Sequence, residues 1–209
     1  MPIQNPSQSW DPLIRLATMA HLSDGATLGN DVAERRARQI ERAAAGCNHA
    51  RSTLLREIES PCYRFCLMQL ACPHRARDAT QETALRLLRS LHRFRGESSL
   101  TTWALSIALN VCREQQRRKR WLPLPHGLAP ADPAPGPHDR IDHREQQSQL
   151  TLALQQLPRR QREAVTLRYL QGLSTAETAR AMRCAEGTVK ATLAKAIRNL
   201  RQAWGPNDG

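Results

Sequence analysis

Six prolines lie between Leu122 and Asp142, at positions 123, 125, 130, 133, 135 and 137, together with two glycines. Proline fixes φ and has no backbone N–H, so a segment this rich in it forms neither a regular helix nor a central strand. We expect an extended linker over residues 122–143. The linker divides the chain into two folded parts, residues 49–121 and 144–205. Residues 1–48 form an N-terminal extension to which the sequence assigns no role.

Apolar residues on both sides of this linker recur at three- and four-residue steps, the spacing of helices that pack on one face. The first run includes Leu54, Ile58, Cys62 and Phe65 and stops before Pro73. Further helices are predicted over about 76–91, 100–120, 144–157, 158–170, 174–182 and 186–203. In the helix over 76–91, Leu85 and its apolar neighbours are expected to face inward. No segment alternates as a strand does, so the predicted fold is all-α, with two small helical domains.

The charge of the chain points to a polyanionic partner. Lys and Arg number 31 against 19 Asp and Glu, which gives a net charge of +12, and nucleic acid is the first expectation for such a balance. No apolar run reaches the roughly 20 residues that a membrane-spanning helix needs. The first ten residues lack the basic and apolar regions of a secretory signal. We therefore expect a cytoplasmic protein that does not insert into membranes.

The last two predicted helices have the layout of a helix-turn-helix. Ser174 and Glu177 form a capping-box pattern at the start of the first helix, and a short turn at residues 183–185 precedes the second. The face of the second helix that includes Thr188, Lys190 and Lys195 is polar, as expected of a helix that enters the DNA major groove. An amphipathic hairpin whose charges only keep it soluble is the alternative.

The end of the helix predicted over 100–120 is strongly basic. Five of the eight residues from Arg113 to Arg120 are Arg or Lys, and such a run is either a solvated tail or a contact to phosphates. Trp103 lies upstream, preceded by four Ser and Thr residues. Aromatic and polar groups beside a basic stripe suit single-stranded bases, although a single Trp is more often a core residue.

The six cysteines show no spacing typical of a disulfide framework, and reduced thiols are expected. Cys62, Cys66, Cys72 and His74 are four soft metal ligands close together in sequence. The alternative is that Cys62 and Cys66 line an apolar helix face, and no metal or other cofactor is expected. The chain shows no Gly-rich phosphate loop, catalytic carboxylate pair or nucleophile signature, so we do not expect an enzyme.

Several stretches together resemble the sigma-70 family of RNA polymerase sigma factors, and within it the extracytoplasmic-function group. Region two of that family is similar to Asp78-Ala-Thr-Gln-Glu82, Phe94-Arg-Gly-Glu-Ser-Ser-Leu-Thr-Thr-Trp103 and Ile107-Ala-Leu-Asn110. Region four is similar to Leu157-Pro-Arg-Arg-Gln-Arg-Glu163, to Leu167-Arg-Tyr-Leu-Gln-Gly-Leu-Ser174 and to Glu186-Gly-Thr-Val-Lys190. Both halves occur in the family's order, over residues 50–120 and 144–203.

The resemblance implies a protein that binds core RNA polymerase, at the beta-prime coiled coil and the beta subunit, and directs it to promoter DNA. An anti-sigma factor is a further partner that the resemblance allows. The residues implied for polymerase binding are Asp78, Gln81, Glu82, Leu85 and Arg86. Those implied for melting and reading the −10 element are Ser98, Ser99, Thr102, Trp103, Asn110, Arg113, Arg117, Arg118, Lys119 and Arg120. Those implied for reading the −35 element are Ser174, Glu186, Gly187, Thr188, Lys190, Ala191, Thr192 and Lys195.

The chain departs from the family pattern in the residues that would meet DNA. Leu100 and Thr101 replace Phe-Arg before Thr-Trp, and Ala191 and Thr192 replace Ser-Arg in the recognition helix. The second replacement removes a long cationic donor, so an altered −35 preference is expected. Arg183 replaces a turn glycine, at a cost on the order of 1 kcal/mol if that residue is left-handed.

Two other functions fit parts of the sequence. An ordinary helix-turn-helix regulator would use the C-terminal motif to bind duplex DNA without polymerase. A metal- or redox-responsive module would be centred on Cys62, Cys66, Cys72 and His74. Neither accounts for the co-occurrence of both sigma-like halves.

Overall fold

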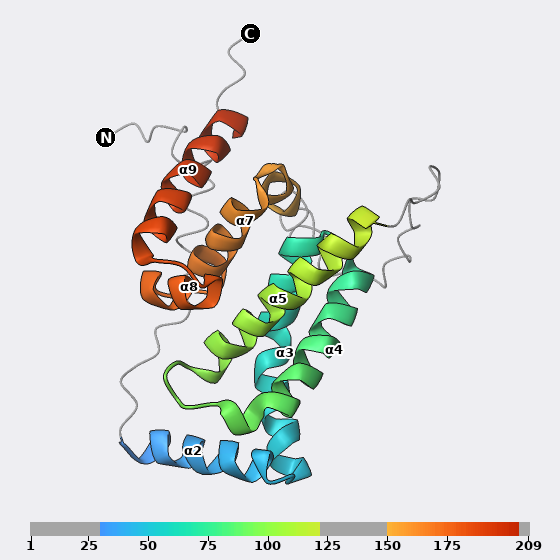
Figure 1. The fold of residues 1–209 in the computed structure, drawn as a ribbon, viewed down its shortest axis with the longest axis vertical. Helices are drawn as coiled ribbons and strands as arrows, with labels where there is room; N and C mark the ends of the chain where they lie inside the picture. The colour runs from blue at the N-terminus through green and yellow to red at the C-terminus, as the bar shows by residue number, and fades with distance from the viewer. Residues whose placement is uncertain (1–29, 122–149, 205–209) are drawn as a thin grey trace, which may run out of the picture.

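The computed structural model describes residues 30–121 and 150–204, with side chains placed over 34–118 and 150–202. The first part holds α2 (Asn30–Ala44), α3 (Asn48–Leu70), α4 (Pro73–Ser90), the short 3₁₀ helix η3 (Leu91–Arg93) and α5 (Leu100–Trp121). The second holds a helix that includes residues 150–156, then α7 (Arg159–Val165), the π-helical turn η4 (Thr166–Leu170), α8 (Thr175–Met182) and α9 (Glu186–Trp204). These ranges contain no strand (Figure 1), which confirms the all-α prediction. The Pro-rich segment 122–143 lies outside the described residues.

Helices α3, α4 and α5 pack against one another around Leu54, Ile58, Phe65, Leu87 and Leu105, all fully buried. The cysteines at 62, 66 and 112 belong to the same core. The three- and four-residue spacing of the apolar residues therefore places one face of each helix inward, as the sequence predicts.

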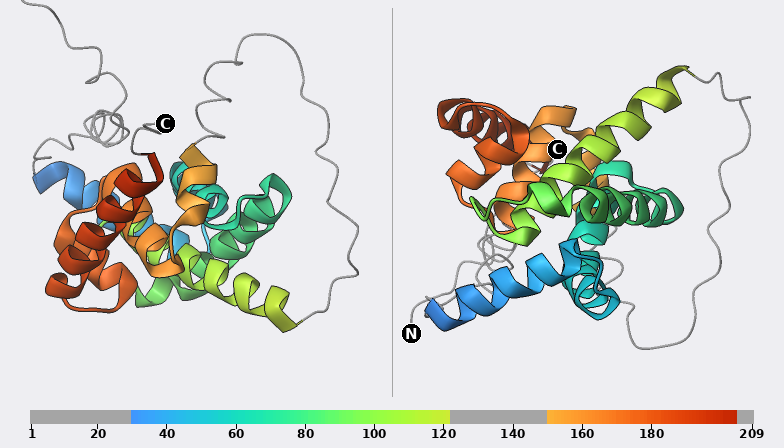
Figure 2. Two further views of the ribbon diagram at one scale, coloured as in Figure 1. Left: turned by 90° about the horizontal axis from the view of Figure 1, so that it is seen from above. Right: turned by 60° about the horizontal axis from the view of Figure 1, so that its bottom comes forward.

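The charged helix α2 contacts the bundle as well as the solvent. Ile40 and Ala43 are buried against it, and Arg36 forms an ion pair with Glu57 of α3. Figure 2 shows α2 lying across one end of α3. Helix α2 therefore packs on the bundle through its apolar side, although the sequence places it in an extension without a role.

The inward face of α4 differs from the one expected. Leu87 is buried, but Leu85 is 49% exposed. The buried positions nearer the start of α4 are Ala76, Ala79, Thr80 and Thr83, and both threonines donate their hydroxyls to the backbone oxygen four residues earlier. Small residues, and threonines whose hydroxyls bond the backbone of their own helix, can face an apolar core. The face of α4 that carries them is therefore the buried one, and Leu85 lies toward solvent. The expectation that Leu85 faces inward is wrong.

Local signals in the C-terminal part act as predicted. Ser174 accepts from the backbone N–H of Glu177, whose carboxylate accepts from the backbone N–H of Ser174, which confirms the capping box. Arg183 ends α8 in the left-handed conformation, with φ 55° and ψ 56°. The C-terminal core is formed by Leu154, Leu167, Val189, Leu193, Ala196 and Leu200.

The two parts of the chain are packed together through α5. This helix contacts α3 and α4 on one side and α8 on the other, and α3 also meets η4 (Figure 1). The far end of α5 projects beyond the bundle in both views of Figure 2. The helix that carries the basic run therefore also forms the contact between the two parts. We call this contact, of α5 with α8 and of α3 with η4, the seam.

Among the helices of the described ranges, none has the length and the apolar character that crossing a membrane requires.

Candidate nucleic-acid and polymerase interfaces

The outer face of α9 presents the side chains predicted to read duplex DNA. Glu186, Gly187, Thr188, Lys190, Ala191 and Lys195 are exposed, and Thr192 is half-exposed. Thr192 donates its hydroxyl to the backbone oxygen of Thr188 at 2.7 Å. The structure brings these residues onto one face at the first turns of the helix, the part that meets base edges when a helix enters the major groove. Ser174 lies apart from them, as the N-cap of α8.

The start of α5 gathers the polar residues predicted for the −10 element. Ser99 accepts from the backbone N–H of Thr102 at 3.0 Å, and the two hydroxyls are 2.9 Å apart. Ser98 is half-buried and Ser99 exposed, whereas Thr102 is only 5% exposed. Trp103 is half-exposed and lies against Phe94, with ring centroids 5.2 Å apart. The aromatic side chain that the sequence suggests for contact with single-stranded bases therefore lies against a second aromatic ring.

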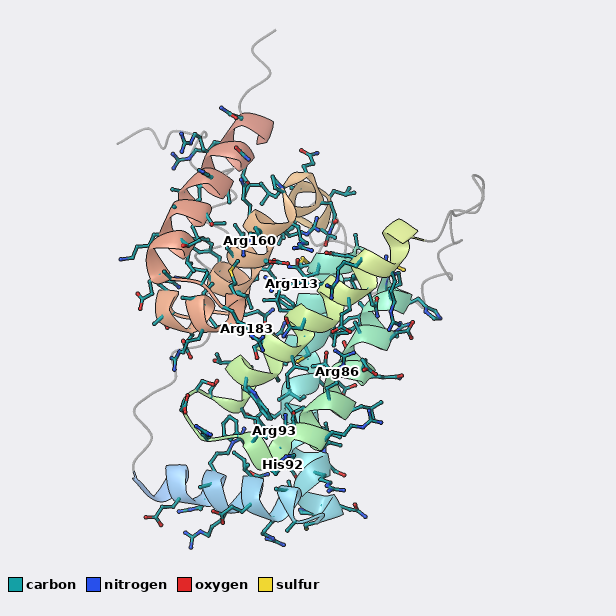
Figure 3. The ribbon with its side chains drawn as sticks, in the orientation of Figure 1. Arg86, His92, Arg93, Arg113, Arg160 and Arg183 are labelled. Carbon is teal, nitrogen blue, oxygen red and sulfur yellow. The ribbon has the colours of Figure 1, made fainter. Side chains whose placement is uncertain are left out.

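A basic groove of about 680 Å³ runs beside α5, at the junction of α4, α5, α7 and the turn after α8. Six arginines line it together with Asn110 and Ile107: Arg86, Arg89, Arg113, Arg117, Arg159 and Arg183. Figure 3 shows Arg113 and Arg183 at the seam between α5 and the C-terminal helices. Glu114 is the one carboxylate among the lining residues. Such a groove suits the phosphates of a nucleic acid strand. Arg117 and Arg118 are exposed farther along α5, and the side chains of Lys119 and Arg120 lie outside the described residues.

Acidic side chains of the C-terminal part hold two of the predicted −10 residues. Arg113 donates to both carboxylate oxygens of Glu163, at 3.0 and 2.7 Å. Thr102 donates to Glu177 at 3.0 Å. The Glu163 side chain is 1% exposed and that of Arg113 is 18% exposed. The hydrogen bonds with Glu163 raise the pKa of the Arg113 guanidinium.

Other polar contacts cross the same seam. Gln69 donates to Thr166 at 3.1 Å, and Gln155 donates to the backbone oxygen of Met68 at 2.7 Å. Arg180 of α8 donates to the backbone oxygen of Glu97 in the loop before α5. The seam is therefore rich in hydrogen bonds between side chains that lie far apart in sequence.

The face of α4 predicted to bind polymerase is exposed at Asp78, Gln81 and Leu85 and half-exposed at Glu82. Arg86 is engaged within the protein: it donates to Glu82 at 2.7 Å and to Glu114 of α5 at 2.8 Å. The structure therefore brings together an acidic and amide face with an apolar residue at its edge, and it gives Arg86 an internal partner.

The four residues considered as metal ligands do not form a site. Cys62 and Cys66 are fully buried in the apolar core, Cys72 is half-buried, and His74 bonds Asp78 with its side chain 84% exposed. In the described ranges, no three His, Cys, Asp or Glu side chains are grouped so that they could hold a metal ion. Burial raises the pKa of the Cys62 thiol, which favours the neutral, unreactive form.

Sequence reasoning missed Glu163 and Arg159. Glu163 lies within a stretch similar to the family, but nothing local marks it as the partner of a residue 50 positions earlier. Glu177 was recognised only as a capping residue. Its bond to Thr102 gives it a second contact that the capping pattern does not reveal.

Two all-helical parts, one with a basic helix and one with an exposed helix-turn-helix, have the architecture of a DNA-binding protein. Residues 52–122 match the family profile of Sigma-70 region 2, and residues 147–200 match Sigma-70, region 4.

Curated relatives carry the same assignment. The chain is 32% identical over 161 residues to the ECF RNA polymerase sigma factor SigM of Mycobacterium tuberculosis, covering 77% of this chain and 80% of the relative. It is 33% identical to BldN of Streptomyces coelicolor, covering 77% of this chain and 62% of BldN, and 32% identical to SigX of Bacillus subtilis, covering 67% and 76%. The chain belongs to the ECF sigma factors of RNA polymerase, which direct promoter-specific initiation of transcription.

Solved structures show the same fold. CnrH, in complex with the cytosolic domain of CnrY, superposes with a TM-score of 0.63 at 18% identity, covering 81% of this chain and 97% of CnrH. The sigma factor RpoE of Bartonella quintana, in complex with the anti-sigma factor NepR, gives a TM-score of 0.53 at 23% identity, covering 74% and 94%.

Proposed function

We propose that this protein binds core RNA polymerase through α4 and positions α5 and α9 on the −10 and −35 elements of its promoters. The observation that carries the proposal is the separation of three surfaces on one chain: the acidic face of α4, the basic groove along α5, and the exposed polar face of α9. Catalysis belongs to the polymerase in this account, and the cytoplasm is the expected location.

The polymerase-binding surface consists of Asp78, Gln81, Glu82 and Leu85. Three of these side chains are exposed, and Leu85 is one of two large apolar side chains exposed in the described ranges. An apolar residue surrounded by carboxylates and an amide suits a partner with basic groups around an apolar contact. Arg86 supports this surface from within through Glu82.

The DNA-reading surfaces differ in what they read. On α9, Lys190 and Lys195 are cations beside Thr188 and Thr192, which suits phosphates and base edges of a duplex. Near α5, the Phe94–Trp103 pair and the polar Ser98–Thr102 segment suit an unpaired base that leaves the stack. We also propose that the first domain spans residues 49–121 and that the second spans residues 144–205.

An anti-sigma factor is a candidate partner, since RpoE was solved with one. An ordinary regulator that binds duplex DNA without polymerase is the competing proposal, but it gives no role to the acidic face of α4.

Copurification with core polymerase tests the α4 surface. The triple variant D78A/Q81A/L85A should lose binding to core polymerase by at least tenfold, whereas exposed residues elsewhere in the first bundle should not matter. Glu59→Ala on α3 is the matched control. Glu59 is exposed, and this substitution removes one carboxylate from the surface, as Asp78→Ala does. Undiminished copurification of the triple variant, with a thermal melt equal to that of the wild type, contradicts the assignment.

A further inference from the structure

The connection of the two DNA-reading parts gives the bound strand a direction along α5. The C-terminal end of α5, where Arg117 is exposed, leads through residues 122–149 to the part with the exposed face of α9. Because the −35 element lies upstream of the −10 element, this end of α5 faces upstream. The aromatic pair of Phe94 and Trp103 lies at the other end of the helix. DNA downstream of the unpaired base therefore leaves α5 past the loop of residues 94–99.

The strand runs out of contacts on α5 at this point. Trp103 and Arg117 lie 14 residues apart, which separates them by about 21 Å along the helix axis. A strand with the B-form rise of about 3.4 Å per nucleotide covers that length with about six nucleotides. Helix α5 begins at Leu100, less than one turn before Trp103. The next elements that the strand meets downstream are therefore the loop and η3.

The loop and η3 carry exposed cations. His92 and Arg93 of η3 and Arg95 of the loop are all exposed. Figure 3 shows His92 and Arg93 between α2 and the first turns of α5. No hydrogen bond or ion pair joins the side chain of either arginine to another side chain in the part of the chain that the structure describes. These guanidinium groups are therefore available to a partner outside the protein.

Helix α2 adds a second row of cations beside η3, on which it packs. Arg35, Arg38 and Arg42 are exposed at i, i+3 and i+7, so they lie on one stripe of the helix. We call this stripe, together with His92, Arg93 and Arg95, the α2–η3 corner. Its five arginines outnumber the exposed carboxylates of α2 and the loop, which are Glu34, Glu41 and Glu97.

Resting on the −10 reading proposed above, we propose that the α2–η3 corner binds phosphates of the same unpaired strand just downstream of the −10 element. Arginines without an internal partner, placed where the strand leaves α5, suit phosphate oxygens. Contacts to phosphates carry no sequence information, so the corner adds affinity for the opened strand and no further preferred base. Helix α2, to which the sequence assigns no role, is then part of the DNA-binding surface.

The test uses holoenzyme, formed from the full chain and core polymerase, with two forked DNAs copied from a mapped promoter. Both DNAs are duplex through the −35 element and single-stranded at the −10 element. In the shorter DNA the strand ends with the −10 element, and in the longer DNA it continues past it. Wild-type holoenzyme should bind the longer DNA about fivefold more tightly, because more phosphates are neutralised.

Arg93→Ala should lose most of this gain and keep the wild-type affinity for the shorter DNA. The slope of log affinity against log salt for the longer DNA should fall by about 0.7, the value for one phosphate contact on a single strand. Arg93→Lys keeps the charge and should keep the gain, whereas a role of Arg93 in folding alone would not depend on charge. Arg38→Ala tests α2 itself and should reduce the gain about twofold.

Arg64→Ala is the matched control. Arg64 is exposed on α3 and donates to Ser60 of the same helix at 3.0 Å, and its removal lowers the charge of the protein by the same amount. The control should keep the full preference for the longer DNA. Circular-dichroism melts of all variants should match that of the wild type.

Four results overturn the proposal. Wild-type holoenzyme could bind both DNAs equally, Arg93→Ala could keep the gain, Arg93→Ala could weaken both DNAs by the same factor, or Arg64→Ala could lose the gain as well. Each leaves specific binding of the shorter DNA intact. Failure of the −10 reading gives a different result, because the wild type would then bind the shorter DNA equally well with a scrambled −10 element, and both proposals would fall.

Discussion

Arg86 donates two hydrogen bonds of 2.8 Å to the two carboxylate oxygens of Glu114, and this pair joins α4 to α5. The bond to Glu114 raises the pKa of the Arg86 guanidinium, with Glu82 as the next contributor, and the same bond lowers the pKa of Glu114. The polymerase-binding helix and the basic helix are therefore fixed relative to each other by a charged pair.

The Arg86–Glu114 pair should contribute modestly to stability, because about a third of each side chain is exposed. In a double-mutant cycle of Arg86→Ala and Glu114→Ala, we expect a coupling free energy of about 0.5–1 kcal/mol in urea unfolding. Glu57→Ala with Arg86→Ala is the control cycle, because Glu57 bonds Arg36 instead. A double-variant effect equal to the sum of the two single effects would mean that the coupling free energy is zero, and would contradict the view that the pair holds α4 on α5.

Arg183→Gly should stabilise the protein. Arg183 has φ 55° at the C-cap of α8, a left-handed conformation that glycine adopts without steric cost, so a gain of about 0.5–1 kcal/mol is expected. The matched control is Arg198→Gly at an exposed position inside α9, where glycine should destabilise by about 1 kcal/mol. A lower melting temperature for Arg183→Gly would mean that the contacts of the Arg183 side chain stabilise the protein by more than its left-handed backbone conformation costs.

Acid should loosen the seam through Glu177. Burial acts to raise its pKa, but hydrogen bonds from Ser174 and Thr102 and the charge of Arg180 outweigh burial and lower it below 4.5. A carboxyl whose folded pKa is lowered stabilises the fold above its unfolded pKa, and this stabilisation is lost as pH falls through the folded value. Glu177→Gln keeps a capping-box residue and should flatten the loss of stability below pH 4.5. Identical acid slopes for both proteins would contradict this role.

Lys190 should be required for the duplex element and not for polymerase binding. Its side chain is exposed on α9, and loss of a contact to phosphate or guanine costs about 1–3 kcal/mol, or roughly tenfold in affinity. Lys190→Ala should weaken the upstream footprint of the polymerase complex while copurification with core stays unchanged. Arg201→Ala, exposed near the other end of α9, should leave the footprint as in the wild type.

The sequence predicts the local structure well because its signals are local. Apolar spacing gives the helices, the Ser174–Glu177 pattern gives the capping box, and the short turn at Arg183 ends α8 as expected. Pairing between side chains that lie far apart in sequence is not marked by any local pattern. Arg113 and Glu163 are 50 positions apart, and no local pattern marks either residue as the partner of the other.

The buried face of α4 shows a second limit. Hydropathy favours Leu85 in the core, but Thr80 and Thr83 are buried instead because each hydroxyl bonds its own helix. Packing of α2 depends likewise on Ile40 and Ala43 within a strongly charged helix, a signal too sparse for periodicity to reveal.

Transcription in vitro tests the central claim most directly. Purified protein is added to core RNA polymerase with fragments of its own genome as templates, and the start sites are mapped. We predict specific transcripts that require the protein, begin downstream of a common pair of elements, and disappear with the triple variant D78A/Q81A/L85A. No specific start on any genomic template, with a polymerase that responds normally to another sigma factor, would contradict the account.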